Sequence, residues 1–295
     1  MNRETFGGGE MEFTAPETQT EKKENLKKKP RMTLFLLRHG QSEEDKTKSN
    51  RGLTELGKDQ VTETLGQLVN TVAEEENPQA KNLAEALKDV QFHLRDSGTE
   101  RTLQQVWLEN DLLVHLGVPQ DHVNLPQSAL DYKERKGKSG PGIAKRLKGV
   151  QGLDQNPDFR KKMKSKEFQA EVGAFTDIEA WALAPDDKVP EGVETLSKMQ
   201  ERYRKDVARA ERLIPRMTEN AQGRIVTIAN SHASIATLAA ASEMGIPLPD
   251  LLKKIGEMPE AQGLRYDFYS EGKEKSVKPF GKDIEPAIEE MGAKK

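Results

Sequence analysis

Three short apolar runs, each followed at once by polar residues and then by a helical pattern, constrain the fold of this chain more than its other features. Strands buried on both faces of a parallel sheet are continuously apolar in this way, and a following helix returns the chain to the same edge. We therefore expect an α/β fold: a three-layer α/β/α sandwich around a mostly parallel, doubly wound sheet. The runs are residues 34–37 (LFLL), 90–94 (VQFHL) and 224–230 (RIVTIAN).

The first run ends in Arg38, His39 and Gly40. In open α/β sheets, ligands bind beyond the carboxyl ends of the strands, where these three residues are expected to lie. An arginine guanidinium offers paired donors to phosphate oxygens, a histidine nitrogen can accept a phosphoryl group, and a glycine lets the backbone approach a ligand closely. The sequence therefore predicts a phosphate pocket in which His39 is the nucleophile.

The other two runs place a second arginine and a second histidine at the same edge. Arg101 follows the second run and His232 follows the third. Phosphoryl transfer depends mainly on positioning and on neutralising the phosphoryl oxygens, which two guanidinium groups and an imidazole can do without a metal. His93, His115 and His122 show no ligand spacing and are interpreted as ordinary histidines, so no metal site is predicted.

Five short motifs occur in a fixed order along residues 32–269. They are RHG at 38–40, GLTELG at 52–57, SGTERTLQ at 97–104, GVET at 192–195 with Arg202 after it, and SHA at 231–233. In this order they resemble the RHG, LTxxG, SxxxRxxQ, GES…R and SHG elements of the histidine phosphatase superfamily, also called phosphoglycerate mutase-like. The resemblance implies the phosphoglycerate mutase-like fold, with a helical insertion over the strand ends.

The resemblance also implies a role for each matched residue. His39 would be the phospho-accepting nucleophile, and Arg38, Arg101 and His232 would bind the phosphate, with His232 also in the catalytic set. A carboxylic acid would protonate the leaving oxygen, water would hydrolyse the phosphohistidine, and no cofactor would be needed. We therefore expect a phosphomonoesterase. The alternatives are phosphoglycerate mutase-type phosphoryl transfer and a non-catalytic phosphate-binding or interaction module.

The general acid is the residue that the sequence leaves open. The superfamily usually places a glutamate in an LxE segment shortly after the second arginine, and here that segment reads LDYKERKG at 130–137, with Tyr132 at the glutamate position. Glu134 is the first candidate and Asp131 the second. Glu194 is a third, although its place before a long helix also fits a first-turn carboxylate that the helix dipole favours.

Two further positions depart from the superfamily pattern. Asp45 stands where an asparagine is expected after RHG. Ala233 replaces the glycine of SHG, and its extra methyl group is expected to crowd the turn. The alanine of SHA, together with the altered acid segment, keeps the non-catalytic module as an alternative.

Length and composition predict one folded domain with flanking tails. The chain has 295 residues, of which 34% are hydrophobic and 32% charged, which is more polar than an average globular protein. Residues 1–30 have few apolar residues and no sustained periodicity, so they are predicted to be a disordered tail. Residues 31–278 would form the phosphatase domain, with 120–190 as an insertion or lid and a closing hairpin at 264–277, and 279–295 would form a C-terminal tail or a loose terminal helix.

Charge and cysteine content limit the expected partners. The chain has no cysteine, which excludes disulfides, thiolate metal sites and cysteine nucleophiles. A net charge of −3 gives no footprint for binding nucleic acid. No apolar stretch approaches the roughly 18 residues of a transmembrane helix, and the N-terminus lacks the apolar core of a signal peptide. We expect a cytoplasmic protein without a membrane partner that acts on a small-molecule or protein phosphate ester; its oligomeric state stays open.

Overall fold

One six-stranded mixed sheet, in the order β3-β2-β4-β1-β5-β6, organises the chain. The computed structural model describes residues 29–43, 51–134, 150–174, 176–219, 221, 223–269 and 274–292. The strands are β1 (Met32–Arg38), β2 (Gln91–Arg95), β3 (Val123–Asn124), β4 (Ile225–Ser231), β5 (Gly263–Phe268) and β6 (Lys275–Phe280). β4 pairs in parallel with β1 and β2, and β2 with β3, whereas β5 and β6 run antiparallel. The mostly parallel sheet and the closing hairpin are confirmed.

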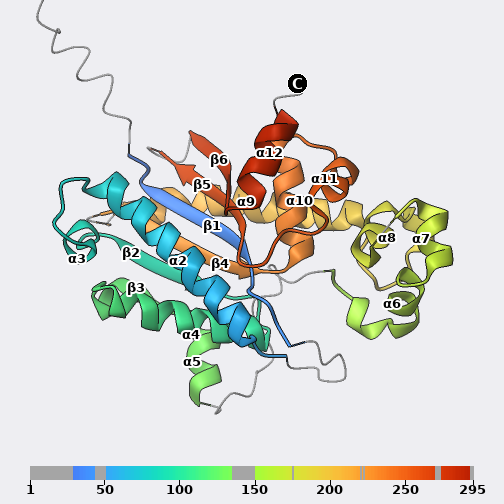
Figure 1. The fold of residues 1–295 in the computed structure, drawn as a ribbon, viewed down its shortest axis with the longest axis horizontal. Coiled ribbons are helices and arrows are strands. Elements are labelled where there is room, and N and C mark those ends of the chain that lie inside the picture. Colours follow the sequence, from blue (N-terminus) through green and yellow to red (C-terminus); the bar gives the residue numbers. More distant parts are fainter. Residues whose placement is uncertain are drawn as a thin grey trace, which may run out of the picture.

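Helices cover both faces of this sheet (Figure 1). Those of the described part of the chain are α2 (Glu55–Glu76), α3 (Leu83–Ala86), α4 (Glu100–His115), α5 (Gln127–Glu134), α6 (Pro157–Met163), α7 (Lys166–Val172), α8 (Asp177–Leu183), α9 (Leu196–Thr218), α10 (Ala233–Met244), α11 (Leu248–Ile255) and α12 (Ile284–Gly292), with 3-10 turns at Gln120–His122, Leu153–Gln155 and Asp186–Lys188. α2 and α4 lie on one face of the sheet, and α9 and α10 on the other.

Each face of the sheet has its own hydrophobic core, because successive side chains of a strand point to opposite sides. In β1, Phe35 and Leu37 pack into the core formed with α2 and α4. Met32 and Leu36 pack into the core formed with α9 and α10. This alternation confirms the predicted three-layer sandwich.

The predicted insertion at 120–190 is largely helical where the structure describes it. Figure 1 shows α6, α7 and α8 grouped beside the sheet, and their buried side chains Phe159, Phe168 and Trp181 join the core on the α9 side. The Trp181 Nε1–H donates to the Glu194 carbonyl at 2.8 Å, which ties the group to the segment before α9. Residues 135–149 lie outside the described part, so a role as a lid stays a prediction.

Most of the predicted C-terminal tail or loose helix is ordered structure packed against the domain. Residues 279–280 complete β6, and α12 packs its Ile284 and Ile288 side chains, 0% and 7% exposed, into the hydrophobic core. The Gln262 side-chain carbonyl accepts the first N–H groups of the helix, from Asp283 at 3.0 Å and Ile284 at 3.1 Å. Two isoleucines four residues apart make a buried stripe on one turn of helix, although the surrounding Lys and Glu residues give the segment a solvated composition. The predicted N-terminal tail lies, apart from residues 29 and 30, outside the described residues.

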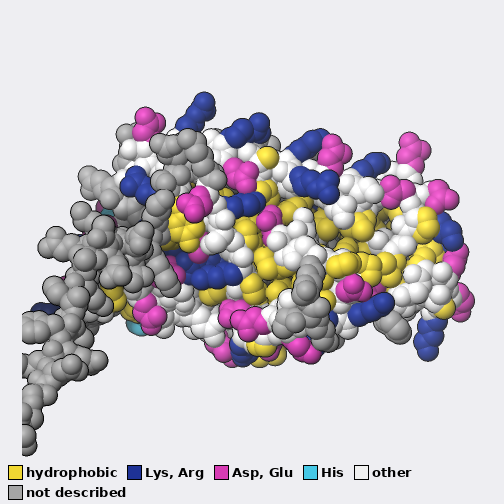
Figure 2. Space-filling view, turned by 90° about the horizontal axis from the view of Figure 1, so that it is seen from above, with side chains coloured by type: hydrophobic (Ala, Val, Ile, Leu, Met, Phe, Trp, Pro, Cys, Tyr) yellow, Lys and Arg dark blue, Asp and Glu magenta, His cyan; other side chains and the backbone are white. Residues whose placement is uncertain are grey.

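The surface carries charges of both signs. In the face shown by Figure 2, Lys and Arg side chains alternate with Asp and Glu around patches of apolar surface, as the small net charge of −3 leads one to expect. Among the described residues, no helix has both the length and the apolar character that a membrane span needs.

A buried charge cluster joins the strands at the amino end of β1 and β4. Arg224, only 3% exposed, donates to the Thr33 hydroxyl and forms ion pairs with Glu75 at 2.9 Å, Glu76 at 3.2 Å and Asp267 at 3.4 Å. Arg265 completes the cluster by pairing with the same Glu75 at 2.6 Å and the same Asp267 at 2.9 Å. Two arginines thus neutralise carboxylates from α2 and β5 at the end of the sheet opposite His39.

Replacing Arg224 by methionine should lower the free energy of unfolding by about 1–3 kcal/mol, because Glu76 loses its cation and Glu75 and Asp267 keep only Arg265. Urea unfolding followed by circular dichroism would measure the loss. Lys205→Met is the matched control, since Lys205 pairs with Glu201 on the exposed face of α9 and its loss should change stability little. An unfolding free energy equal to that of the control would show that the cluster does not stabilise the fold.

Candidate active site

The register of the parallel strands brings three chain segments to one edge of the sheet. Arg38 pairs with Ser231 at the ends of β1 and β4, and Arg95 pairs with Ala229 at the end of β2. The residues that follow each strand therefore meet. The His39 and His232 rings lie 5.4 Å apart between centroids, at an interplanar angle of 77°.

Arg101, at the start of α4, reaches the same place. Its Nη2 lies 3.2 Å from Nδ1 of His232. Together with the ring contact between His39 and His232, this brings three of the four predicted phosphate-site residues into one cluster.

His39 is held as a neutral imidazole with one nitrogen tied. Its side chain is 7% exposed, and Nδ1 lies 2.7 Å from the Gly40 carbonyl oxygen. Because a carbonyl only accepts, Nδ1 carries the proton and Nε2 keeps its lone pair. Burial, followed by the positive charge of Arg101, lowers the pKa of His39 to about 3, against a raising effect of the Gly40 hydrogen bond. A buried imidazole with a bare Nε2 is the form that attacks an electrophile.

His232 is oriented by partners on both ring nitrogens. Nδ1 faces the Arg101 guanidinium, which only donates, so Nδ1 accepts. Nε2 then carries the proton and donates to the Ser97 hydroxyl at 2.9 Å. Ser97 is itself buried and lies 3.2 Å from the Thr102 hydroxyl. The imidazole and the guanidinium therefore form one hydrogen-bonded unit facing His39.

Two glycines explain why the RHG and GLTELG segments occur together. A Cβ added to Gly40 would overlap the carbonyl oxygen of Gly57, and a Cβ added to Gly57 would overlap that of Gln41. The Thr54 N–H donates to the Gln41 carbonyl at 3.0 Å, and the Thr54 hydroxyl accepts from Gly57 N–H at 2.9 Å as the N-cap of α2. The loop that carries His39 and the first turn of α2 are thus one packed unit.

Arg38 lies at the edge of this cluster and faces carboxylates. Its Nη1 donates to the Met258 carbonyl at 2.5 Å, and its guanidinium lies 3.5 Å from Glu260 and 3.8 Å from Glu257. These three partners belong to the loop between α11 and β5. Burial raises the pKa of Glu257, against the lowering effect of Arg38. The structure therefore gives Arg38 protein partners that the sequence did not predict.

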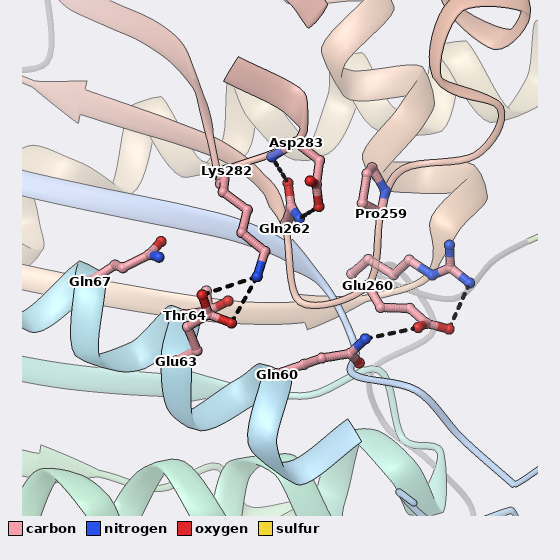
Figure 3. A pocket seen from close by; sticks show the side chains of 11 residues that line it. Gln60, Glu63, Thr64, Gln67, Pro259, Glu260, Gln262, Lys282 and Asp283 are labelled. Atoms are coloured by element: carbon pink, nitrogen blue, oxygen red, sulfur yellow. Dashed lines mark hydrogen bonds and ion pairs between the residues drawn. The ribbon is translucent and has the colours of Figure 1, made fainter. Parts of the chain in front are cut away.

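Arg38 also lines a polar cavity of about 330 Å³ between α2 and the β5–β6 end of the sheet. Figure 3 shows Gln60 reaching across this cavity to Glu260, at 3.2 Å, while Glu260 faces the Arg38 guanidinium. On the other wall, Lys282 pairs with Glu63 at 3.0 Å. The cavity thus adjoins the candidate site through Arg38.

The structure describes the side chain of only one of the three candidate acids. Glu134 and Asp131 lie on α5, and their side chains are outside the described part of the structure. Glu194 is bound by Arg202, whose Nε and Nη2 donate to its two oxygens at 2.7 Å each, and it also accepts from the Gln151 N–H at 3.2 Å. Glu194 therefore ties the segment before α9 to Arg202 of that helix, and it precedes the N-cap Thr195, so the interpretation as a first-turn carboxylate is wrong.

The structure adds a carboxylate next to the cluster that sequence reasoning missed. Asp96 follows β2 directly and is 2% exposed. It accepts from Gly98 N–H at 2.5 Å and from the Ser128 hydroxyl of α5. In the sequence, its place directly after an apolar run and before Ser97 is the signal that could have pointed to this residue. These two contacts make it a support for the turn that carries Ser97.

Of the two departures from the superfamily pattern, only one lies in the described part of the chain. Ala233 is the first residue of α10, and it is not among the residues with positive φ. Its backbone therefore lies outside the left-handed region that favours glycine, and the crowding by its methyl group stays a prediction. Asp45 lies outside the described residues.

A buried polar network beneath His39 was not predicted. Gln105, Glu109 and Asn230 are 1%, 1% and 0% exposed. Gln105 Nε2 donates to Glu109 at 2.9 Å and to the Asn230 side-chain carbonyl at 2.7 Å, and Asn230 Nδ2 donates to Glu109 at 2.9 Å. Burial raises the pKa of Glu109 to about 7, against the two hydrogen bonds. In the sequence, Glu109 is one of several charged residues on an amphipathic helix, so only the fold shows it to be inside.

No family model and no curated protein matches the sequence. The fold is similar to solved structures. An alpha-ribazole phosphatase from Shigella flexneri is 14% identical, with a TM-score of 0.42 over 85% of this chain and 96% of that one. A mycobacterial glucosyl-3-phosphoglycerate phosphatase is 15% identical, with a TM-score of 0.43 over 84% and 96%. A phosphoglycerate mutase from Bacillus anthracis is 13% identical, with a TM-score of 0.44 over 90% and 97%.

These neighbours are histidine phosphatase superfamily proteins. With TM-scores below 0.5 and identities of 13 to 15%, the similarity does not by itself assign an activity to this chain. Among the described residues, no group of three or more His, Cys, Asp or Glu side chains could hold a metal ion.

The depressed pKa of His39 makes a direct prediction for NMR spectroscopy. The imidazole signals of His39 should stay constant between pH 8 and pH 5, because a pKa of about 3 keeps the ring neutral, whereas an unperturbed histidine titrates near 6.5. The unfolded chain would then bind more protons than the folded one, so stability should fall as the pH drops from 6.5 towards 3. Loss of the signal in His39→Ala assigns it, and a midpoint near 6.5 would contradict the buried neutral state.

Proposed function

We propose that this chain is a phosphomonoesterase that hydrolyses a phosphate ester through a phosphohistidine on His39. The observation that carries the proposal is the hydrogen bond from His39 Nδ1 to the Gly40 carbonyl, at 2.7 Å. It leaves Nε2 with its lone pair as the attacking atom, in the cluster formed with His232 and Arg101. In the first step Nε2 forms a bond to phosphorus while the bond to the ester oxygen breaks. In the second step water attacks phosphorus, inorganic phosphate leaves, and Nε2 regains its lone pair.

Arg101 and His232 supply the donors for the phosphoryl oxygens. The Arg101 guanidinium lies 3.2 Å from His232 Nδ1, and its planar fork of N–H donors suits the oxygens of a phosphoryl group bound beside the two rings. A preorganised positive group at this position stabilises the charge that spreads over the equatorial oxygens in the transition state. Arg38 joins them when a phosphate dianion replaces its long contacts with Glu257 and Glu260, at 3.8 and 3.5 Å.

Glu134 is the proposed proton donor to the leaving oxygen, with Asp131 as the alternative. Both lie on α5, which packs beside α4, because the Trp107 Nε1–H of α4 donates to the Ala129 carbonyl of α5 at 3.0 Å. The helix that carries Arg101 therefore also holds the acid segment. Glu194 is not chosen, since Arg202 occupies both of its oxygens.

Replacing His39 by alanine should lower the hydrolysis of p-nitrophenyl phosphate at least about 10³-fold, because the nucleophile is removed. The wild-type protein, quenched during turnover, should carry a phosphoryl group that is stable in base and labile in acid, as phosphohistidine is. His115→Ala, on the exposed side of α4, is the control and should keep full activity. Binding of phosphate or vanadate by a wild-type protein without turnover would instead favour the non-catalytic module.

Exchange of labelled phosphate between two esters would identify a mutase. A phosphatase releases the label as inorganic phosphate, whereas a mutase returns it to a hydroxyl group of the substrate. Both outcomes need the same intermediate on His39, so this measurement separates the two activities without a further variant.

Replacing Glu134 by glutamine should separate substrates by their leaving groups. Hydrolysis of an alkyl phosphate should fall by about 10²–10⁴-fold, the scale of general acid catalysis, whereas hydrolysis of p-nitrophenyl phosphate should change far less because its leaving group needs no proton. Asp131→Asn tests the alternative acid in the same two assays. Glu194→Gln is the comparison that should lower stability without changing the ratio of the two rates. An unchanged ratio in both Glu134→Gln and Asp131→Asn would contradict the acid assignment.

A further inference from the structure

The Glu109 carboxyl group contacts two side-chain amides close to the loop that carries the proposed nucleophile, and its burial costs free energy. Glu109 is 1% exposed, and the contacts that hold it come from Gln105 and Asn230. Burying a carboxyl group without a cation disfavours its charged form, which is why its pKa is raised to about 7. Apolar side chains of similar size would fill the same space at lower cost. The network therefore needs an explanation other than stability.

Gln105 connects this network to the backbone of the nucleophile loop. Its side-chain oxygen accepts from the Gly40 N–H at 3.1 Å. The two hydrogens of its Nε2 go to Glu109 and Asn230. The oxygen and both hydrogens of this amide then have partners. If the amide were turned over, its NH2 group would face the Gly40 N–H, and two donors would meet.

The backbone at Gly40 depends on such hydrogen bonds because it has no side chain to restrict it. The close approach of Gly57 excludes any Cβ at this position, and glycine is the residue with the widest range of backbone conformations. The peptide group before Gly40 is held by Gln105, and the one after it by Gln60, whose side-chain oxygen accepts from Gln41 N–H at 2.9 Å.

The conformation of Gly40 decides where its carbonyl oxygen points. That oxygen is the acceptor for Nδ1 of His39, at 2.7 Å. If the Gly40 backbone rotated, Nδ1 would lose its acceptor, the proton would be free to occupy Nε2, and the attacking lone pair would be lost.

We propose that Glu109 is a positioning residue for His39, acting through Gln105 and the Gly40 backbone to fix the imidazole tautomer that attacks. Asn230 completes the unit by holding Glu109 and Gln105 in one plane of hydrogen bonds. The catalytic consequence rests on the proposed phosphohistidine chemistry, whereas the structural part, the tautomer of His39, can be measured without any substrate.

The main test uses Glu109→Gln, which keeps the shape and removes the charge. Three amides would then meet with one donor facing another, whichever way they turn, so the Gln105 amide loses its fixed direction. We expect kcat to fall by about 10- to 100-fold, as for a small misplacement of a reacting group, with KM changed little because no substrate contact is removed. In long-range ¹H–¹⁵N spectra, His39 should shift from the Nδ1-protonated form towards a mixture of both tautomers.

Two further variants separate positioning from packing. Val106→Ala, on the same buried helix face and 0% exposed, lowers core stability without touching Gly40 and should keep kcat and the tautomer. The triple variant Gln105→Leu, Glu109→Leu and Asn230→Val removes the buried polar groups together. It should melt within a few degrees of the wild type and yet show the low kcat and the mixed tautomer.

The outcomes distinguish this inference from the proposed function. A tautomer shift in Glu109→Gln supports the positioning of His39 even if the wild-type protein shows no phosphatase activity, a result that would remove the proposed function. An unchanged tautomer in both Glu109→Gln and the triple variant would overturn the inference, whatever the activity. So would a loss of kcat no larger than that of Val106→Ala at equal melting temperature.

Discussion

The parallel pairing of β4 with both β1 and β2 is the constraint on which the rest of this structure depends. It places three strand ends in register, so that segments almost 200 residues apart in sequence meet at one edge of the sheet: Arg38 lies opposite Ser231, and Arg95 opposite Ala229. His39, Arg101 and His232 each follow one of these ends by a few residues. Their proximity therefore follows from backbone hydrogen bonds of the sheet, and the side chains add only the final orientation.

The two ends of the sheet use charge for different purposes. At the amino end, Arg224 and Arg265 are paired with carboxylates on several sides, an arrangement that joins α2, β4 and β5. At the carboxyl end, Arg101 contacts the His232 imidazole, and Arg38 bonds to the Met258 carbonyl and lies 3.8 and 3.5 Å from Glu257 and Glu260. The ion pairs of Arg38 are longer, and therefore weaker, than the short ones at the amino end. The fold thus separates the charges that join its elements from the residues of the candidate site.

The sequence predicted what depends on local pattern. The apolar runs and their polar ends were sufficient for the mostly parallel sheet and for placing His39, Arg101 and His232 together, because strand register follows from burial. It did not predict that Glu257 and Glu260 face Arg38, since a contact across more than 200 residues leaves no local signal. It did not single out Glu109 of α4 as a buried residue, and it predicted 279–295 as a tail or loose helix, because composition does not tell which side of a helix is buried.

The contact between Gly40 and Gly57 sets a limit on how this protein can change over time. Each glycine faces a backbone oxygen as its nearest neighbour, and although Val61 also lies near Gly40, shortening that side chain would leave the contact with the Gly57 oxygen in place. A larger residue at either position therefore has no compensating partner elsewhere in the sequence, unlike an overpacked core position, which a smaller neighbour can relieve. Lineages of this chain should drift freely on most of the α2 surface while these two positions remain fixed together.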